Sequence, residues 1–139
     1  MGNGLKVLID LNVILDVLQR RAPFYETSSQ VLAGAETELF EGWVAAHSLT
    51  TLFYILSKRQ TVERTRLAMS ELLQFLSVAP VDQPVIEQAL TLPYSDYEDA
   101  VQMMAAVRAG MTHLVTRNLE DYRAGPLPVL LPAELLALL

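Results

Sequence analysis

Short apolar runs alternate along the chain with longer stretches in which apolar residues recur at helical spacing. The runs are rich in β-branched and aliphatic residues, as expected of strands that are covered on both faces. They predict strands over Leu5–Ile9, Trp43–Ala46, Ser77–Val81, His113–Thr116 and Pro128–Leu131. The stretches between them predict helices over Asn12–Arg20, Phe24–Thr37, Ser48–Lys58, Val62–Leu76, Asp82–Leu92, Glu98–Ala109 and Pro132–Leu138. Strands that alternate with helices are typical of βαβ units, so the fold class is α/β with a mainly parallel sheet.

Residues at the ends of these helices support the pattern. Pro23 follows the first helix and ends it, and Gly110 is placed to cap the helix that closes at Ala109. Five apolar residues near i, i+3, i+4 spacing predict a buried face on the fourth helix: Leu67, Met69, Leu72, Leu73 and Leu76.

Length and composition indicate one apolar-rich domain. A chain of 139 residues is of ordinary size for one domain, and we expect residues 1–139 to form it. Hydrophobic residues make up 52% of the chain and charged residues 19%, which is more apolar than a typical soluble domain. Part of this apolar surface is therefore expected to be buried in a homodimer.

The location is predicted from three absences in the sequence. Without cysteine the chain forms neither disulfides nor thiolate metal sites, which suits a reducing cytoplasm. The N-terminal MGNGLKVLID has one lysine and a short apolar run, unlike a signal peptide. No apolar stretch reaches the length of a membrane span. We therefore expect a cytoplasmic protein with no membrane partner.

Polar residues gather where the predicted strands end. In open parallel sheets, ligands bind outside the carboxyl ends of the strands, so these residues are the candidates for chemistry. They are Asp10, Asn12 and Asp16 after the first strand, His47, Ser48 and Thr51 after the second, Asn118, Glu120 and Asp121 after the fourth, and Asp96, Glu98 and Asp99 at the start of the helix that leads into the fourth. Acids from distant parts of the chain are thus expected to converge on one edge of the sheet.

Converging carboxylates repel one another unless a raised pKa, a basic partner or a divalent cation relieves them. Most basic residues lie in other segments, at Arg20–Arg21, Lys58–Arg66 and Arg108–Arg123, which favours the cation. Oxygen ligands suit Mg²⁺ or Mn²⁺, and such an ion polarises a phosphoryl oxygen and lowers the pKa of bound water. The residues therefore predict metal-assisted hydrolysis of phosphodiesters.

The net charge of −6 argues against indiscriminate binding to nucleic acid, unless basic residues cluster or metal ions offset the acids. One such cluster, which we call the basic cluster, consists of Lys58, Arg59, Arg64 and Arg66. It is a candidate RNA-facing surface, and a solvated helix face is the alternative.

Several candidates also have a purely structural interpretation. Ser95-Asp96-Tyr97-Glu98 is a capping-box pattern, and Asn118-Leu119-Glu120-Asp121 resembles one. His47 and His113 have no His or Cys partner at ligand spacing and are interpreted as structural. Asp10 differs, because an Asp that closes an apolar strand costs desolvation energy unless a function uses it.

Four sequence blocks in order resemble the PIN-domain family over essentially the whole chain. They are VLIDLNVILD, VAAHSLTTLFYIL, SDYEDAVQMMAAVRAG, and HLVTRNLEDY followed by PVLLP. The resemblance implies a three-layer α/β/α sandwich with a central sheet of about five strands. It also implies a Mg²⁺- or Mn²⁺-dependent ribonuclease, often a homodimer and in many members a toxin that a small antitoxin protein neutralises.

The family's site residues map onto this sequence one by one. The first acid falls on Asp10, the acid of the later helix on Asp99 with Asp96 one turn earlier, and the last acidic position on Asn118, with Asp121 as the nearest carboxylate. The implied catalytic residues are Asp10, Asp99 and Asp121. The implied metal ligands are Asp10, Asp96, Asp99, Asn118 and Asp121, and the implied substrate contacts are Asn12, Ser48, Thr51 and Arg117.

Two positions depart from the family pattern. Thr51 stands where many members carry Glu, and Asn118 is also neutral. Because affinity in such sites rises with the charge of the ligands, metal binding is expected to be weak. A non-catalytic PIN fold that binds RNA or protein is therefore one alternative. A haloacid-dehalogenase-like phosphatase is another, but its second Asp would fall on Asn12, and the second half of the chain has no lysine.

Overall fold

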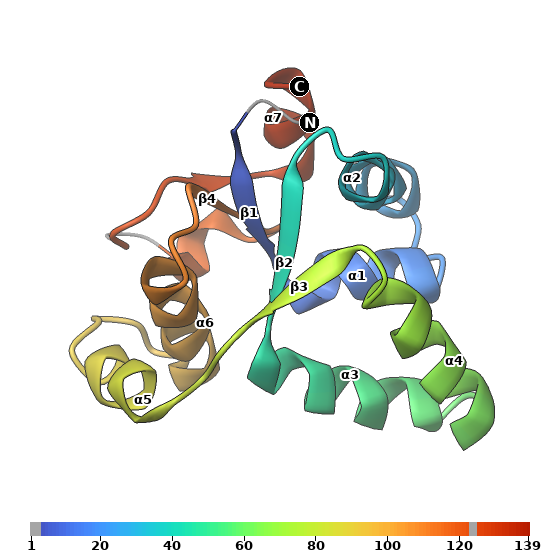
Figure 1. The fold of residues 1–139 in the computed structure, drawn as a ribbon, viewed down its shortest axis with the longest axis horizontal. Helices are drawn as coiled ribbons and strands as arrows, with labels where there is room; N and C mark the ends of the chain where they lie inside the picture. Colours follow the sequence, from blue (N-terminus) through green and yellow to red (C-terminus); the bar gives the residue numbers. More distant parts are fainter. Residues whose placement is uncertain (1–3, 123–124) are drawn as a thin grey trace.

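Five parallel strands form the central sheet, in the order β3-β2-β1-β4-β5 (Figure 1). The computed structural model describes residues 4–122 and 125–139. The strands are β1 (Lys6–Ile9), β2 (Glu41–Ala45), β3 (Leu76–Ala79), β4 (His113–Val115) and β5 (Val129–Leu130). In the register of the sheet, Leu8 lies opposite Trp43 and Ile9 lies opposite Val115. The carboxyl ends of β1 and β4 therefore meet at one edge.

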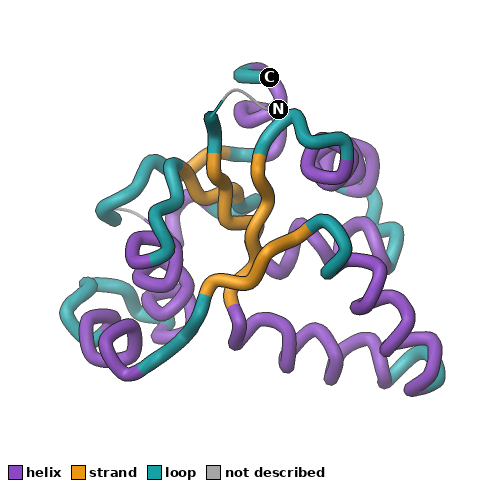
Figure 2. Tube along the Cα trace, viewed as in Figure 1, coloured by secondary structure: helices purple, strands orange, loops and turns teal. Residues whose placement is uncertain are grey.

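Helices cover both faces of this sheet, which gives the three-layer α/β/α sandwich (Figure 2). Their bounds are α1 (Leu11–Leu18), α2 (Tyr25–Glu36), α3 (Ala46–Ser57), α4 (Val62–Leu72), α5 (Gln83–Ala89), α6 (Tyr97–Arg108) and α7 (Pro132–Ala137), with a 3₁₀ helix η1 (Leu119–Tyr122). One hydrophobic cluster joins the sheet to α1–α4 and α7, and a second joins it to α5 and α6.

The central strand β1 contributes to both clusters. Val7 and Ile9 pack on the side of α1 and α2, whereas Leu8 packs on the side of α6. Successive side chains of a strand point to opposite faces, so a strand covered on both faces is apolar at every position. This is why the run in the sequence shows no polar alternation.

The predicted order of elements and the α/β/α architecture are confirmed, but the junction after α4 was predicted wrongly. The predicted helix over Val62–Leu76 ends at Leu72, and β3 begins at Leu76 instead of spanning Ser77–Val81. The apolar spacing continues across the turn into the strand, so it does not mark where the helix ends. As a result, Leu72 and Leu76 are buried, whereas Leu67 and Leu73 are exposed.

Other predicted ends need smaller corrections. β2 begins at Glu41 instead of Trp43, and Ala46 already belongs to α3, which had been expected to start at Ser48. The helices α1 and α5 and the strands β4 and β5 are shorter than predicted, because turns or extended residues take up their ends. No helix in residues 4–122 and 125–139 has the length and apolar character needed to cross a membrane.

Candidate active site

Asp10 lies at the junction of β1 and α1 and is only 9% exposed. Its backbone N–H donates to the carbonyl of Val115 at 3.0 Å, which fixes it beside the end of β4. Its Oδ1 accepts a hydrogen bond from Gln102 Nε2 at 3.0 Å, and its Oδ2 accepts one from Thr116 Oγ1 at 3.1 Å. Burial raises the pKa of Asp10, and these hydrogen bonds oppose that rise.

Asp99 lies in the first turn of α6, on the other side of the same cavity. Asp96 caps this helix, because its Oδ1 accepts from the N–H of Glu98 at 2.8 Å and of Asp99 at 3.4 Å. Burial raises the pKa of Asp99 to about 6; the hydrogen bond from Tyr122 opposes the rise, and the charges of the nearby aspartates add to it. The smaller contributions of Asp96, Asp10 and Asp121 to this shift reflect their negative charges near Asp99.

Gln102 and Tyr122 connect these two carboxylates. Gln102 Nε2 donates to Asp10 and also to the Tyr122 hydroxyl at 2.6 Å, and that hydroxyl donates to Asp99 Oδ1 at 2.9 Å. Burial, followed by the charges of Asp10 and Asp99, raises the pKa of Tyr122, which stays protonated. Neither residue was predicted from the sequence. A glutamine one turn after Asp99, within an apolar helix face, was the available signal.

A cavity of about 180 Å³ lies between the starts of α1, α3 and α6. We call this space the carboxylate cavity. Its polar lining consists of Asp10, Asn12, His47, Ser48, Thr51, Asp96, Glu98, Asp99 and Gln102. As predicted, Asp10 and Asp99 are near neighbours, and the predicted contacts Asn12, Ser48 and Thr51 line the same cavity. His47 Nε2 lies 3.2 Å from the carbonyl of Glu98 and so ties α3 to α6.

Asp121 lies in an adjoining cavity, which shares Asp96 and Asp99 with the carboxylate cavity. Its Oδ2 accepts a hydrogen bond from Asn118 Nδ2 at 2.8 Å, so the two residues proposed for the last acidic position are bonded to each other. Of the four predicted acids, Asp96 and Asp99 thus line both cavities, Asp10 lines the carboxylate cavity, and Asp121 lines the adjoining one.

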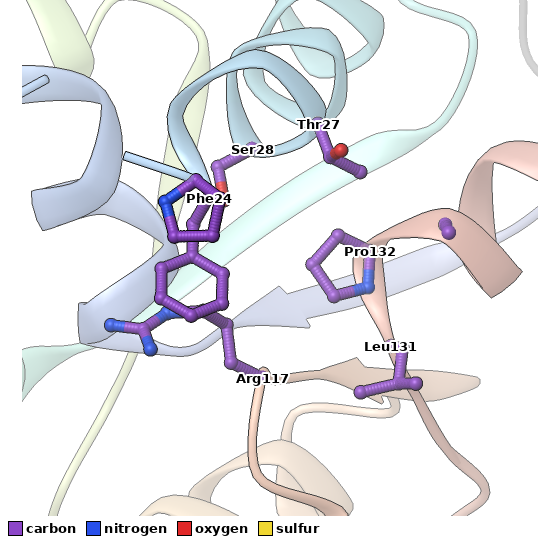
Figure 3. A pocket seen from close by; sticks show the side chains of 8 residues that line it. Phe24, Thr27, Ser28, Arg117, Leu131 and Pro132 are labelled. Atoms are coloured by element: carbon purple, nitrogen blue, oxygen red, sulfur yellow. The ribbon is translucent and has the colours of Figure 1, made fainter. Parts of the chain in front are cut away.

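Arg117 and Asp16 form an ion pair away from the carboxylate cavity. Arg117 Nε lies 2.7 Å from Asp16 Oδ2, and its guanidinium stacks on the ring of Phe24 at 3.9 Å (Figure 3). Asp16 was expected among the converging acids, but this residue of α1 is completely buried in the interior of the protein. The reason is that Asp16 lies six positions after Asp10, in the second turn of α1, and so away from the edge where Asp10 lies.

Arg21 is closer to the site than its position in the sequence indicated. Its guanidinium lies along α1, bonded to Gln19 Oε1 and, at 3.4 Å, to Asn12 Oδ1. Because Asn12 lines the carboxylate cavity, one positive charge stands at its rim.

The donors fit a hydrated divalent cation better than a fully coordinated one. Within residues 4–122 and 125–139, no three His, Cys, Asp or Glu side chains are arranged to hold a metal ion. Mg²⁺, however, usually keeps several waters and is held by only one or two carboxylates. Asp10 and Asp99, with neutral oxygens from Asn12, Ser48 and Thr51 in the lining of the same cavity, supply that donor set.

Several known proteins are similar to this chain. The profile of the PIN domain matches residues 6–120. Ribonuclease VapC1 of Aquifex aeolicus (strain VF5) is 26% identical over 125 residues, which cover 86% of each protein. A toxin–antitoxin complex from Klebsiella pneumoniae contains a chain of the same fold, with a TM-score of 0.70, 22% identity, and coverage of 91% of this chain and 97% of that one. VapC20 of Mycobacterium tuberculosis, a toxin that cleaves the sarcin–ricin loop, has a TM-score of 0.61 at 14% identity and covers 78% of this chain and 86% of its own.

Proposed function

The chain belongs to the PIN-domain family, and from this premise we propose that it is a divalent-metal-dependent endoribonuclease that hydrolyses RNA phosphodiester bonds. One observation carries the proposal. Asp10 and Asp99, from segments far apart in the sequence, line one cavity and are hydrogen-bonded by neutral donors, so their charge remains available to a cation. Family membership sets aside the haloacid-dehalogenase alternative.

Each residue around the carboxylate cavity has a proposed role. Asp10 and Asp99 would hold Mg²⁺ or Mn²⁺, which when bound supplies charge for a phosphoryl oxygen and a more acidic water. Asn12, Ser48 and Thr51 would contact the substrate, since they bring neutral polar groups to the same cavity. Asp96 and Asp121 line the adjoining cavity and are candidates for a supporting acidic role.

RNA is the proposed substrate, and the basic cluster is the proposed path for its backbone. Helix α3 starts at the carboxylate cavity and ends at Ser57, directly before Lys58. A helix of this length spans about 18 Å, the reach of a few nucleotides. The ammonium of Lys58 lies 4.3 Å from the ring centre of Tyr54, which is 62% exposed. A cation beside an exposed ring suits a phosphate with a stacked base.

The biological setting that we propose is a toxin–antitoxin pair in the cytoplasm. The similar chain from Klebsiella pneumoniae belongs to a toxin–antitoxin complex, which supports a small antitoxin protein as a partner of this chain. We also propose a homodimer. Large apolar side chains are exposed on α4, namely Val62 at 46% and Leu67 at 62%, and a partner surface would cover them.

The decisive experiment measures Mn²⁺ binding and cleavage of an unstructured RNA by the purified protein, with Asp10→Asn as the control. We expect cleavage that requires Mn²⁺ or Mg²⁺ and that is lost in the Asp10→Asn variant. The second candidate function is a non-catalytic PIN fold that binds RNA or protein, which the neutral Thr51 and Asn118 favour. RNA binding without cleavage at any concentration of metal would select that alternative.

A further inference from the structure

A continuous chain of hydrogen bonds runs between the two carboxylates of the site. It starts at Asp10 Oδ1, passes through the Gln102 amide at 3.0 Å, continues to the Tyr122 hydroxyl at 2.6 Å, and ends at Asp99 Oδ1 at 2.9 Å. Gln102 and Tyr122 are both about 97% buried, since each is only 3% exposed. The hydrogen-bond chain is therefore shielded from bulk water. In such a low-dielectric interior, hydrogen bonds are stronger than in water.

The direction of every bond in this chain follows from Asp10 acting as an acceptor. An ionised carboxylate only accepts hydrogen bonds, so the NH₂ side of the Gln102 amide must face Asp10. The same NH₂ group gives its second hydrogen to the Tyr122 hydroxyl, which leaves the phenolic hydrogen for Asp99. Gln102 Oε1 is buried and has no hydrogen-bond partner among the described residues. A buried acceptor without a partner is costly, and turning the amide would set that oxygen against Asp10 instead.

Tyr122 is itself held in place from outside the chain. The Tyr94 hydroxyl donates to the backbone carbonyl of Tyr122 at 3.2 Å, and the two rings meet edge to face at 5.9 Å. The packing of the two rings, which does not depend on the Tyr94 hydroxyl, therefore holds the Tyr122 side chain in place before any ligand arrives.

We propose that Gln102 and Tyr122 are positioning residues, which hold the side chains of Asp10 and Asp99 in fixed orientations at one cavity. The proposal rests on the proposed function and adds to it how two carboxylates are oriented for metal binding in a site that has few acids. A basic residue between the carboxylates would neutralise them, whereas an amide and a phenol satisfy their lone pairs and leave the negative charge for a cation. Partners of this kind orient metal ligands, and their loss typically weakens metal binding by about 10–100-fold.

The first test uses the metal-free protein at a fixed neutral pH. The ¹³C carboxylate signals of Asp10 and Asp99 are assigned with the two Asp→Asn variants and compared between the parent and Tyr122→Phe. We expect both signals to move, that of Asp99 directly and that of Asp10 through Gln102. Tyr94→Phe is the matched control, since it removes a hydroxyl from the adjacent ring that bonds only a backbone carbonyl. An unmoved Asp10 signal in Tyr122→Phe would overturn the proposal.

The second test measures the Kd for Mn²⁺ by electron paramagnetic resonance. We expect Tyr122→Phe and Gln102→Met each to raise the Kd by about tenfold. Because both residues act in the same chain of hydrogen bonds, the double variant should raise the Kd by less than the product of the two single fold-changes. Tyr94→Phe should keep the parental Kd. Equal Kd values for Tyr122→Phe and Tyr94→Phe would refute the positioning role, provided that urea midpoints show all variants folded.

The two tests separate this proposal from the proposed function. If the parent protein binds no Mn²⁺ and cleaves no RNA, the proposed function fails, and the carboxylate signals of the metal-free protein still decide whether Gln102 and Tyr122 link the two aspartates. If Mn²⁺ binds and RNA is cleaved but neither variant changes the Kd, the proposed function stands and the positioning role is refuted.

Discussion

Replacing Arg117 by Met should destabilise the protein strongly, even though Arg117 lies near the end of β4, where substrate contacts are expected. The variant removes the guanidinium that lies 2.7 Å from Asp16 Oδ2. The Asp16 side chain is completely buried, whereas the Arg117 side chain is 25% exposed. After the substitution, the hydroxyl of Ser28, at 3.1 Å, is the remaining hydrogen-bond donor to Asp16 within the described ranges.

The size of the effect follows from this asymmetry. Removing one partner of a buried ion pair costs about 3–5 kcal/mol, because the other charge stays buried without compensation. The partial exposure of Arg117 lets solvent screen the pair, so the lower end of that range applies. Stacking of the guanidinium on Phe24 at 3.9 Å adds about 0.5–1 kcal/mol. We therefore expect a loss of about 3–4 kcal/mol, a large part of the stability of an ordinary domain.

Urea denaturation measures this loss, with the fluorescence of Trp43, the single tryptophan, as the probe. The matched control is the double variant Asp16→Asn with Arg117→Met, which removes both charges and should recover much of the lost stability. Asp16→Asn alone should cost less than Arg117→Met, because the partly exposed guanidinium can be hydrated. If Arg117→Met is as stable as the parent but binds RNA more weakly, Arg117 is a substrate contact, and the structural role argued from the ion pair is refuted.

Three further predictions test the site and the assembly. Thr51→Glu adds a carboxylate to the lining of the carboxylate cavity, so the Kd for Mn²⁺, measured by calorimetry, should fall. Asn118→Asp removes the amide that donates to Asp121 and should leave this Kd unchanged. A lower Kd in Asn118→Asp alone would reverse this assignment. In metal-free protein, the raised pKa of Asp99, about 6, means that ionisation of its carboxyl opposes folding. The stability that the protonated carboxyl of Asp99 contributes is complete below the unfolded pKa of 3.8 and is lost as the pH rises through about 6. Thermal melts of the parent should show this loss of stability, and those of Asp99→Asn should not. Light scattering at micromolar concentration should give a dimer that Leu67→Asp weakens; a monomer at every concentration would contradict it.

The sequence allowed the position of the main carboxylates to be predicted, because that position follows from the sheet. Short, nearly apolar runs predict strands covered on both faces, and parallel strands deliver the residues that follow them to the same edge of the sheet. Asp10 and Asp99 are accordingly near neighbours at that edge. The same rule could not locate Asp121, which depends on how η1 turns after β4 and bonds to Asn118.

The supporting residues were not predictable from pattern alone. Gln102 occupies a buried position of α6 that the helical period assigns to apolar packing, and only the three-dimensional contact with Asp10 shows why an amide is there. Likewise, the apolar spacing from Leu67 to Leu76 is continuous in the sequence, although a helix ends and a strand begins within it. Periodicity records which residues are apolar, but not where the backbone changes direction.

The clearest contrast in the molecule is between Asp10 and Asp16, two buried aspartates from the same block of sequence. Consecutive residues at the end of β4 supply their partners. Thr116 donates a neutral hydrogen bond to Asp10 at 3.1 Å, and Arg117 places its positive charge 2.7 Å from Asp16. Asp16 is thereby neutralised within the fold, whereas Asp10 keeps its charge and faces the carboxylate cavity. An aspartate paired with Arg117 in the interior thus lies six positions after one that has neutral hydrogen-bond partners and faces a cavity where a cation could bind.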